Sequence, residues 1–495
     1  MPRPFVAARP DSYAPVPEPV RDRAADAVLD VLPGPRPRGP VARAALTARF
    51  VRDTPRFLMD LRREYGEAVA FPLQGELFVA LFAPAMVNEV LVAQQHAFIK
   101  GVGFARMRKV LGEGLLTNEE PIHLRHRRMM QAPFHPSRLD GYAALMAELT
   151  DAEVHGWRPG GTVLLGPAMM RLTLEIVARS LFGTGAAHEA ERIAHAMEVA
   201  IDRIERTMLP GLDRFDASGL PWFREFGRAA DELAGIAERL VAERRARAGG
   251  GDGVGVAESV DVATARRDED LLGLLLALRD DDGSAFTDDE VRDEALTLIL
   301  SGHETTANAL TWAFSYLASE PAARAALEAE ADVQAWLTEG RTPGVEELMA
   351  APYAGAVLDE ALRLAPPVWV APRRALRDVD VAGVAVPEGA HVIVSQYVTH
   401  RDPTHFPDPE RFDPTRWLDG LERRLPRGAY VPFGAGTRRC LGDRFAMLEG
   451  RLILLAVARR LRLDPVDPRR PVPRAQPRAT YRPRGDVPMR VVARG

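Results

Sequence analysis

One run of residues near the middle of the chain, 287–321, constrains the fold more than any other. It opens with Thr287 followed three residues later by Glu290, the pattern of a capping box, and it closes on a Glu-Pro stop. Between these ends lie about thirty residues of helical pattern, apolar on nearly every side around the segment LTLIL. A helix without a polar face is stable only when it is buried. The sequence therefore predicts a long helix inside a large core.

The centre of this helix carries a polar interruption, SGHETT at residues 301–306. Gly302 costs roughly 1 kcal/mol relative to alanine, and threonine hydroxyls compete for backbone carbonyls. Two interpretations fit: a kinked helix packed closely on a neighbour, or a functional site. His303 and Glu304 also begin an HExxH zinc motif. Ala307 stands where the second histidine must be, which argues against a zinc hydrolase.

The composition is that of a folded globular protein, and it argues against several partners. Of the 495 residues, 46% are hydrophobic and 27% are charged, and the formal net charge of -5 argues against nucleic acid as a partner. No stretch approaches the ~20 apolar residues of a membrane span, and the first residues lack the apolar centre of a signal peptide. The single cysteine cannot form an internal disulfide, which favours a reducing compartment. We therefore expect a cytoplasmic protein, with peripheral membrane contact left open.

The chain divides into a tail, one large domain and an internal loop. Residues 1–40 are interpreted as a Pro/Arg-rich tail that is poorly ordered over its first ~30 residues. Residues 41–495 show mostly helical patterns, with strand-like runs at 68–82 and 392–398. A glycine-rich segment, 248–265, is interpreted as a flexible surface loop within the domain. The expected fold class is mainly α with a small β region, in a single large domain.

The only cysteine of the chain lies in the decamer FGAGTRRCLG, residues 433–442. A strong amphipathic helix pattern follows Cys440, so its sulfur is expected at a helix N-terminus, where free N–H groups and the helix dipole favour a thiolate. Gly434, Gly436 and Gly442 allow the backbone to turn sharply and approach closely. The decamer lacks the third glycine of a dinucleotide fingerprint, and the chain has no phosphate-binding P-loop. The pattern therefore indicates a thiolate ligand.

Four motifs, taken together, resemble those of the cytochrome P-450 family. The decamer, F-x-x-G-x-R-x-C-x-G, resembles the family's heme-binding signature, and residues 301–306 resemble its oxygen-activation motif. Glu360 and Arg363 match the ExxR pair, and FPDPERF at 406–412 matches the meander. The cysteine decamer is highly specific, whereas ExxR alone is not. The resemblance covers residues 41–495 and implies the family's single heme-thiolate domain.

The resemblance also implies roles for residues around heme b (iron protoporphyrin IX). Cys440 would be the axial iron ligand, whose thiolate favours cleavage of the O–O bond of O2. Thr305 would hold a proton-delivering water beside the dioxygen, and Glu304 would relay protons from solvent. Arginine and histidine side chains would bind the propionates. The residues assigned to the cofactor are Cys440, Phe433, Gly434, Arg438, Gly442, His123, Arg127, Arg373 and Gly302, and those assigned to a buried structural triad are Glu360, Arg363 and Arg411.

The expected substrate is a hydrophobic small molecule such as a fatty acid, a terpenoid or a carotenoid. The segment PPVWVAP at 366–372 is apolar, as expected for the wall of a pocket that binds such a compound. By resemblance, the distal pocket is lined by the loop at 101–116 and by Leu298, Ser301, Val368, Trp369 and Val370.

Electrons are expected from another protein, because the chain contains no flavin or iron–sulfur motif. The resemblance implies a ferredoxin or flavodoxin type donor, reduced by NAD(P)H through its reductase. Arg125, Arg128, Arg439 and Arg444 lie in segments expected on the proximal face, where they could steer an acidic donor. A solvated basic face is the alternative interpretation.

Two other functions are compatible with the same heme. One is a peroxide-driven peroxygenase or an isomerase, and the other is a non-enzymatic heme sensor or ligand carrier. The adjacent Glu304 and Thr305 favour an oxygen-dependent monooxygenase over the first of these, because proton delivery to dioxygen needs such a pair.

Overall fold

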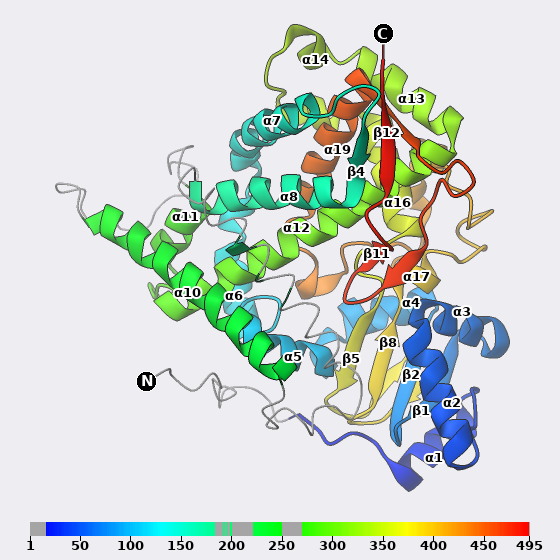
Figure 1. The fold of residues 1–495 in the computed structure, drawn as a ribbon. Coiled ribbons are helices and arrows are strands. Elements are labelled where there is room, and N and C mark those ends of the chain that lie inside the picture. The colour runs from blue at the N-terminus through cyan, green and yellow to red at the C-terminus, as the bar shows by residue number, and fades with distance from the viewer. Residues whose placement is uncertain are drawn as a thin grey trace.

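The computed structural model describes residues 16–183, 192, 193, 196, 199, 221–249 and 270–494. These residues form a helical body with a smaller β region, and the N-terminal helices lie against that β region (Figure 1). The mainly α fold class with a small β region is confirmed.

The elements, in chain order, are as follows. The α-helices are α1 (Asp22–Val31), α2 (Gly39–Arg52), α3 (Thr54–Tyr65), α4 (Pro84–Asn88), α5 (Val102–Leu111), α6 (Ile122–Met130), α7 (Leu139–His155), α8 (Leu165–Phe182), α10 (Pro221–Gly249), α11 (Leu271–Ala277), α12 (Asp288–Ser319), α13 (Pro321–Asp332), α14 (Ala335–Glu339), α15 (Val345–Met349), α16 (Pro352–Leu364), α17 (Gln396–Thr399), α18 (Leu421–Arg424) and α19 (Asp443–Arg460). The strands are β1 (Ala68–Leu73), β2 (Glu76–Leu81), β3 (Phe98–Lys100), β4 (Thr162–Leu164), β5 (Ala371–Ala375), β6 (Val379–Val381), β7 (Val384–Val386), β8 (His391–Val394), β9 (Leu461–Pro465), β10 (Ala475–Pro477), β11 (Tyr481–Pro483) and β12 (Pro488–Ala493). The short 3₁₀ or π segments include η1 (Glu89–Ala93), η7 (Pro414–Trp417) and η8 (Gly436–Arg438).

The long helix expected from the sequence is α12, which runs through the helical body beside α8 (Figure 1). Its capping box is confirmed: Thr287 Oγ1 accepts a hydrogen bond from Glu290 N at 3.2 Å, and a Glu290 carboxylate oxygen accepts one from Thr287 N at 2.8 Å. Buried residues lie on nearly every side of α12, and α8, α10, α16 and α19 pack around it. The helix stays α-helical through residues 301–306, so the polar interruption does not break it.

The largest sheet has the strand order β1-β2-β8-β5-β3. The strands expected at 68–82 are confirmed as the antiparallel hairpin β1–β2, and β2 lies parallel to β8. Strand β5 is antiparallel to both β8 and β3, in a register that places Lys100 directly opposite Arg373. Three smaller sheets, β4-β12-β9, β10-β11 and β6-β7, complete the β region.

The strand expected at 392–398 is shorter than its sequence pattern. Strand β8 ends at Val394, and residues 396–399 form helix α17. Ser395 accounts for the change, because its hydroxyl oxygen accepts a hydrogen bond from Val398 N at 3.4 Å and so caps the new helix.

The expectation of a poorly ordered N-terminal tail is wrong for part of residues 1–40. Residues 22–31 form helix α1, and Val20, Ala25 and Leu29 are buried against the sheet. The spacing of these apolar residues is compatible with a helix. The expectation of a poorly ordered tail rested on the proline and arginine content of the segment, which does not reveal that spacing. Residues 1–15 lie outside the described part of the chain, as do residues 250–265 of the expected internal loop. Within the described ranges, no helix is both long and apolar enough to cross a membrane.

Candidate active site

A cavity of about 350 Å³ brings the cysteine decamer and the centre of α12 together. Cys440 lies in one wall, and Ser301, Gly302 and Thr305 lie in another. Most of the other lining residues are apolar, and they come from helices α5, α6, α8, α11, α12, α16 and α19, from strand β5 and from the loops between such elements. Two motifs that are 135 residues apart in sequence, 305 against 440, therefore face the same cavity.

The decamer forms a tight loop because its glycines accept conformations that other residues avoid. Gly434 and Gly436 both have φ of 70°, and a Cβ at Gly436 would lie 2.1 Å from the carbonyl oxygen of Leu91. The backbone N–H of Cys440 donates to Phe433 O at 2.8 Å and closes the loop. As a result the Cys440 side chain is exposed to the cavity, which Phe433 also lines.

The Cys440 thiol is not held as a thiolate by the helix terminus alone, contrary to the expectation from sequence. Helix α19 begins only at Asp443, with Gly442 as its N-cap. Although the Cys440 side chain is open to the cavity, desolvation by the surrounding protein raises the pKa of its thiol, and a hydrogen bond from the Gly442 backbone opposes this shift. A coordinating thiol is deprotonated outright by a bound metal cation. A metal ion bound at Cys440 would therefore stabilise the thiolate that this loop presents to the cavity.

Basic side chains gather at one end of the cavity with too few carboxylates to balance them. Lys100, Arg373 and Arg438 all line it, and Glu119 forms an ion pair with Arg438. Burial, followed by the charge of Arg438, lowers the pKa of Lys100 well below its usual value and that of Arg373 to about 10. Such an uncompensated cluster is a binding site for anionic groups.

These features fit heme, a flat apolar cofactor with two carboxylates at one edge. Cys440 lines the same cavity as Lys100, Arg373 and Arg438, so the cysteine would bind the iron and the three cations would hold the propionates. Lys100 was not among the residues predicted from the sequence. A signal was available, because this chain has only two lysines and otherwise uses arginine.

The two residues expected from the HxxxR pattern both line the cavity, and they differ in charge. Burial lowers the pKa of His123 to about 4, so this side chain is neutral at pH 7, and its Nδ1 lies 3.1 Å from Glu120 Oε1. Arg127 lines the cavity, but one of its N–H groups donates to the carbonyl of Arg439 in the cysteine loop. His123 therefore adds no charge at the cavity edge, whereas Arg127 keeps its positive charge beside those of Lys100, Arg373 and Arg438.

Helix α12 brings Thr305 to the cavity but not Glu304. The Thr305 hydroxyl donates to Ser301 O at 2.8 Å, and the side chain lines the cavity. Glu304 is buried elsewhere, where Thr480 Oγ1 donates to its Oε1 at 2.6 Å and Asn308 Nδ2 donates to Thr480 Oγ1 at 3.1 Å. Adjacent residues differ by about 100° around a helix, which explains the separation.

Gly302 lines the cavity and also permits close packing of α12 on α8. A Cβ at this position would lie 2.8 Å from Val177 Cγ2, closer than two carbon atoms approach without a shift. Both interpretations of the polar interruption therefore apply to the same residue.

We expect Gly302→Ala to destabilise the protein although alanine is the better helix former. The clash with Val177 costs about 1–3 kcal/mol and the helix propensity returns at most ~1 kcal/mol. In a double-mutant cycle with Val177→Ala, urea unfolding should show non-additive changes in the unfolding free energy. The double variant should lose about 1 kcal/mol less than the sum of the losses in the two single variants. Gly235→Ala in α10 is the matched control, since only Arg239 lies near, at 3.7 Å, and it should be neutral or stabilising. Strict additivity would contradict the packing argument.

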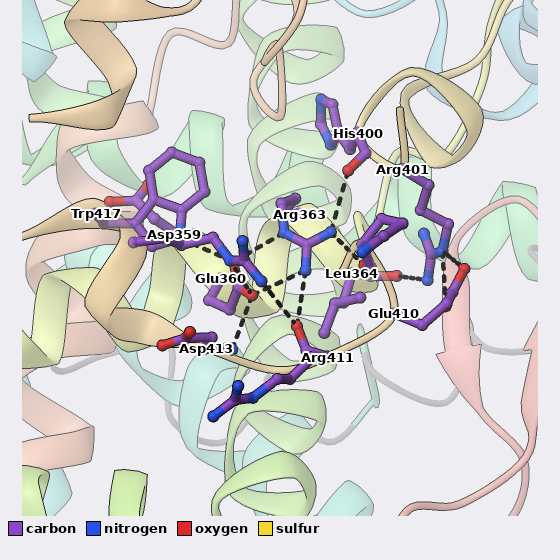
Figure 2. Close-up of polar contacts among 12 residues, drawn as sticks. Asp359, Glu360, Arg363, Leu364, His400, Arg401, Glu410, Arg411, Asp413 and Trp417 are labelled. Atoms are coloured by element: carbon purple, nitrogen blue, oxygen red, sulfur yellow. Dashed lines mark hydrogen bonds and ion pairs between the residues drawn. The ribbon is translucent and has the colours of Figure 1, made fainter. Parts of the chain in front are cut away.

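The ExxR pair forms the centre of a buried polar cluster (Figure 2). Glu360 and Arg363 are fully buried, and two N–H groups of Arg363 donate to the two carboxylate oxygens of Glu360 at 2.8 Å each. Arg363 also donates to the carbonyl oxygens of His400, Pro409 and Arg411 at 3.1, 2.6 and 3.0 Å. This cluster ties α16 to the meander and to His400, whose Nε2 accepts a hydrogen bond at 2.9 Å from Val431 N, two residues before the cysteine loop.

The predicted side-chain triad with Arg411 is wrong. Arg411 contributes its backbone carbonyl, while its side chain is exposed and points away from Glu360 (Figure 2). Arg416 of η7 takes the expected place, with its Nε 3.0 Å from Glu360 Oε1, and Trp417 Nε1 donates to the other carboxylate oxygen at 2.9 Å. The path of the backbone through the meander determines which arginine side chain reaches Glu360 of α16. The spacing of residues in the motif does not predict that path.

The substrate side of the cavity is apolar, with one departure from the predicted lining. Leu298, Val368 and Val370 line it, together with Ser301. Trp369 does not, because successive residues of an extended segment alternate in direction and its indole N–H donates to Arg478 O at 2.9 Å on the other side. The expected loop at 101–116 is largely helix α5, and this region contributes Phe104, Leu115 and Leu116 to the lining.

The arginines expected to steer an electron donor are partly neutralised. Arg125 pairs with Glu290 and Asp280, Arg128 pairs with Asp280 and Asp281, and Arg439 pairs with Asp443. Arg444 is exposed. The net positive field on this face is therefore smaller than four arginines would suggest.

Comparison with known proteins identifies similar chains and folds. The family model described as Cytochrome P450 matches residues 33–485. Cyclooctat-9-en-7-ol 5-monooxygenase of Streptomyces melanosporofaciens is 36% identical over 386 residues, which are 77% of this chain and 79% of that protein. Cyclooctatin synthase of the same organism is 34% identical over 407 residues, or 82% and 84% of the two chains. The crystal structure of the cytochrome P450DA heme domain superposes with a TM-score of 0.78 at 25% identity, covering 94% of this chain and 98% of that one.

Proposed function

This chain belongs to the cytochrome P450 family, and we propose that it inserts one oxygen atom of O2 into a cyclic terpenoid, with electrons from a separate ferredoxin or flavodoxin. It is a heme-thiolate monooxygenase that acts on hydrophobic compounds. The terpenoid class is favoured over fatty acids and carotenoids because one similar protein is named as a monooxygenase of cyclooctat-9-en-7-ol. The apolar wall formed by Leu298, Val368 and Val370 suits such a compound.

The observation that carries the proposal is that Cys440 and Thr305 face one largely apolar cavity. Heme held by Cys440 would supply the activation of O2, which protein side chains cannot perform. Lys100, Arg373 and Arg438 would hold the propionates, and Phe433 would shield the sulfur. The apolar walls would exclude bulk water and position the substrate near the reacting oxygen.

Proton delivery would fall to Thr305, with Glu304 as the source. The Thr305 oxygen can accept a hydrogen bond from a water while its own O–H continues to donate to Ser301 O. Glu304 is held by Thr480, so it must release this partner before it can pass a proton towards the cavity. This arrangement would keep the acid out of the cavity between turnovers.

The test is oxidation of cyclooctat-9-en-7-ol or another cyclic terpenoid under ¹⁸O2, with NAD(P)H, a ferredoxin and its reductase. A product with one ¹⁸O atom supports the proposal. Turnover with peroxide and none with the electron-transfer proteins would favour the peroxygenase alternative. Tight binding of the terpenoid without any oxidation would favour a carrier.

We expect Thr305→Ala to lower the product formed per NAD(P)H by about tenfold or more, because the positioned hydroxyl that delivers protons is lost. NAD(P)H consumption should continue and hydrogen peroxide should accumulate. Thr311→Ala is the matched control: its hydroxyl also donates to a helix carbonyl, Ala307 O at 2.7 Å, but the residue does not line the cavity. An unchanged ratio, or an equal loss in Thr311→Ala, would refute the role of Thr305.

A further inference from the structure

Two cations stand side by side at the edge of the main sheet. Lys100 of β3 and Arg373 of β5 are directly opposite in an antiparallel pair, so their side chains leave the sheet on the same face, and both line the cavity. Like charges in this position destabilise a sheet unless an anion lies between them. The neighbouring carboxylate, Glu119, is already bound to Arg438 and to the backbone N–H of Lys100, the latter at 2.8 Å.

The Lys100 ammonium also holds the segment between α5 and α6. Its Nζ donates to Leu115 O at 3.0 Å and to Asn118 O at 2.7 Å. Leu115 and the adjacent Leu116 line the substrate side of the cavity. An ammonium group has three N–H donors, so one is left for a group inside the cavity that Lys100 lines.

We propose that Lys100 couples the heme to the substrate-binding wall, donating to a propionate and to the carbonyls of Leu115 and Asn118 at once. The proposal rests on the proposed function only in requiring heme. Arg438 forms an ion pair with Glu119, whereas Lys100 and Arg373 pair with no carboxylate among the described residues, so both face the cavity with charges that the two propionates can balance. Heme binding thereby fixes the main chain that carries Leu115 and Leu116, and Lys100 is a cofactor-binding and positioning residue.

The chain offers a matched control in Arg108. Its NH2 donates to Thr117 O at 2.8 Å and its Nε lies 2.9 Å from Glu113 Oε1, so it holds the same segment, but it does not line the cavity. Arg108 therefore tests contacts that hold this segment from outside the cavity, whereas Lys100 tests such a contact together with the link to heme.

The experiment compares wild type, Lys100→Met and Arg108→Met, each with and without heme. Amide hydrogen exchange is followed across residues 112–121, and heme release is followed by transfer to apomyoglobin. In the wild type, heme should slow exchange in this segment. Lys100→Met should remove that heme-dependent difference and speed heme release by about tenfold, the loss expected for one charge-assisted hydrogen bond. Arg108→Met should raise exchange in both states, keep the heme-dependent difference and leave heme release unchanged.

Three results would overturn the proposal. One is heme release from Lys100→Met at the wild-type rate, another is a heme-dependent difference that survives in this variant, and the third is accelerated heme release in Arg108→Met as well. Lys100→Arg, which keeps the charge, should restore slow heme release, and this guards against a variant that simply folds poorly. If the wild type binds heme with thiolate ligation while Lys100→Met behaves as wild type, only this inference fails. If the wild type takes up no heme, the proposed function fails.

Discussion

Replacing Cys440 with serine is expected to abolish the strongly red-shifted Soret band of the reduced protein with carbon monoxide. Product formation should fall by more than ~100-fold, beyond the ~10–100-fold that outer partners of a metal site typically contribute. The reason is that a hydroxyl donates far less electron density to iron than a thiolate does, and the thiolate is what favours O–O cleavage. The apolar walls and the cations around the cavity remain in the variant, so some heme uptake should persist.

The single cysteine gives this prediction an internal control. In the wild type without heme, Cys440 is the only group that a thiol reagent can label, and its raised pKa of about 11 makes labelling at pH 7 slow and increasingly fast as the pH rises towards that value. Heme should block labelling at every pH because iron occupies the sulfur. A carbon monoxide band that survives in Cys440→Ser, or a thiol that stays reactive in the heme-loaded wild type, would refute thiolate ligation.

Replacing Arg363 with methionine should cost about 3–5 kcal/mol of unfolding free energy, measured by urea unfolding. The change removes both hydrogen bonds to Glu360 and leaves that fully buried carboxylate without its principal counter-charge. It also frees three backbone carbonyls of the meander and the loop before it. Because Arg363 also holds the carbonyl of His400, whose Nε2 accepts a hydrogen bond from Val431 N two residues before the cysteine loop, heme content should fall in parallel.

Two neighbouring arginines, Arg416 and Arg411, provide matched controls. They distinguish the observed cluster, in which Arg416 binds Glu360, from the triad predicted by the motif, in which Arg411 does. Arg416→Met removes one ion pair to Glu360 and should cost about 1.5–3 kcal/mol. Arg411→Met should stay within about 0.5 kcal/mol of wild type, because Arg411 contributes only its carbonyl and its side chain is exposed. If Arg411→Met were as damaging as Arg363→Met, the arrangement in Figure 2 would be wrong.

Much of the fold and the centre of the site could be predicted from the sequence because their signals are local. A capping box needs only Thr287 and Glu290, three residues apart, and both of its hydrogen bonds are present. The tight turns at Gly434 and Gly436 follow from glycine's freedom at positive φ. The strands at 68–82 follow from their apolar pattern. At 392–398 the apolar pattern continues, but the cap at Ser395 ends the strand and the second half forms helix α17.

The sequence by itself determined the fold class, the family and the residue types at the heart of the site, because spacing within a helix, turn or motif is fixed by backbone geometry. Only the tertiary structure decided which neighbour faces the cavity: Thr305 and not Glu304, Val368 and not Trp369. It also decided that Lys100 joins Arg373 at the cavity edge. The physical reason is that these outcomes depend on which distant segments of the chain pack together. The pKa of a thiol or a basic side chain is set by its burial and by neighbouring charges, and both are determined by that packing.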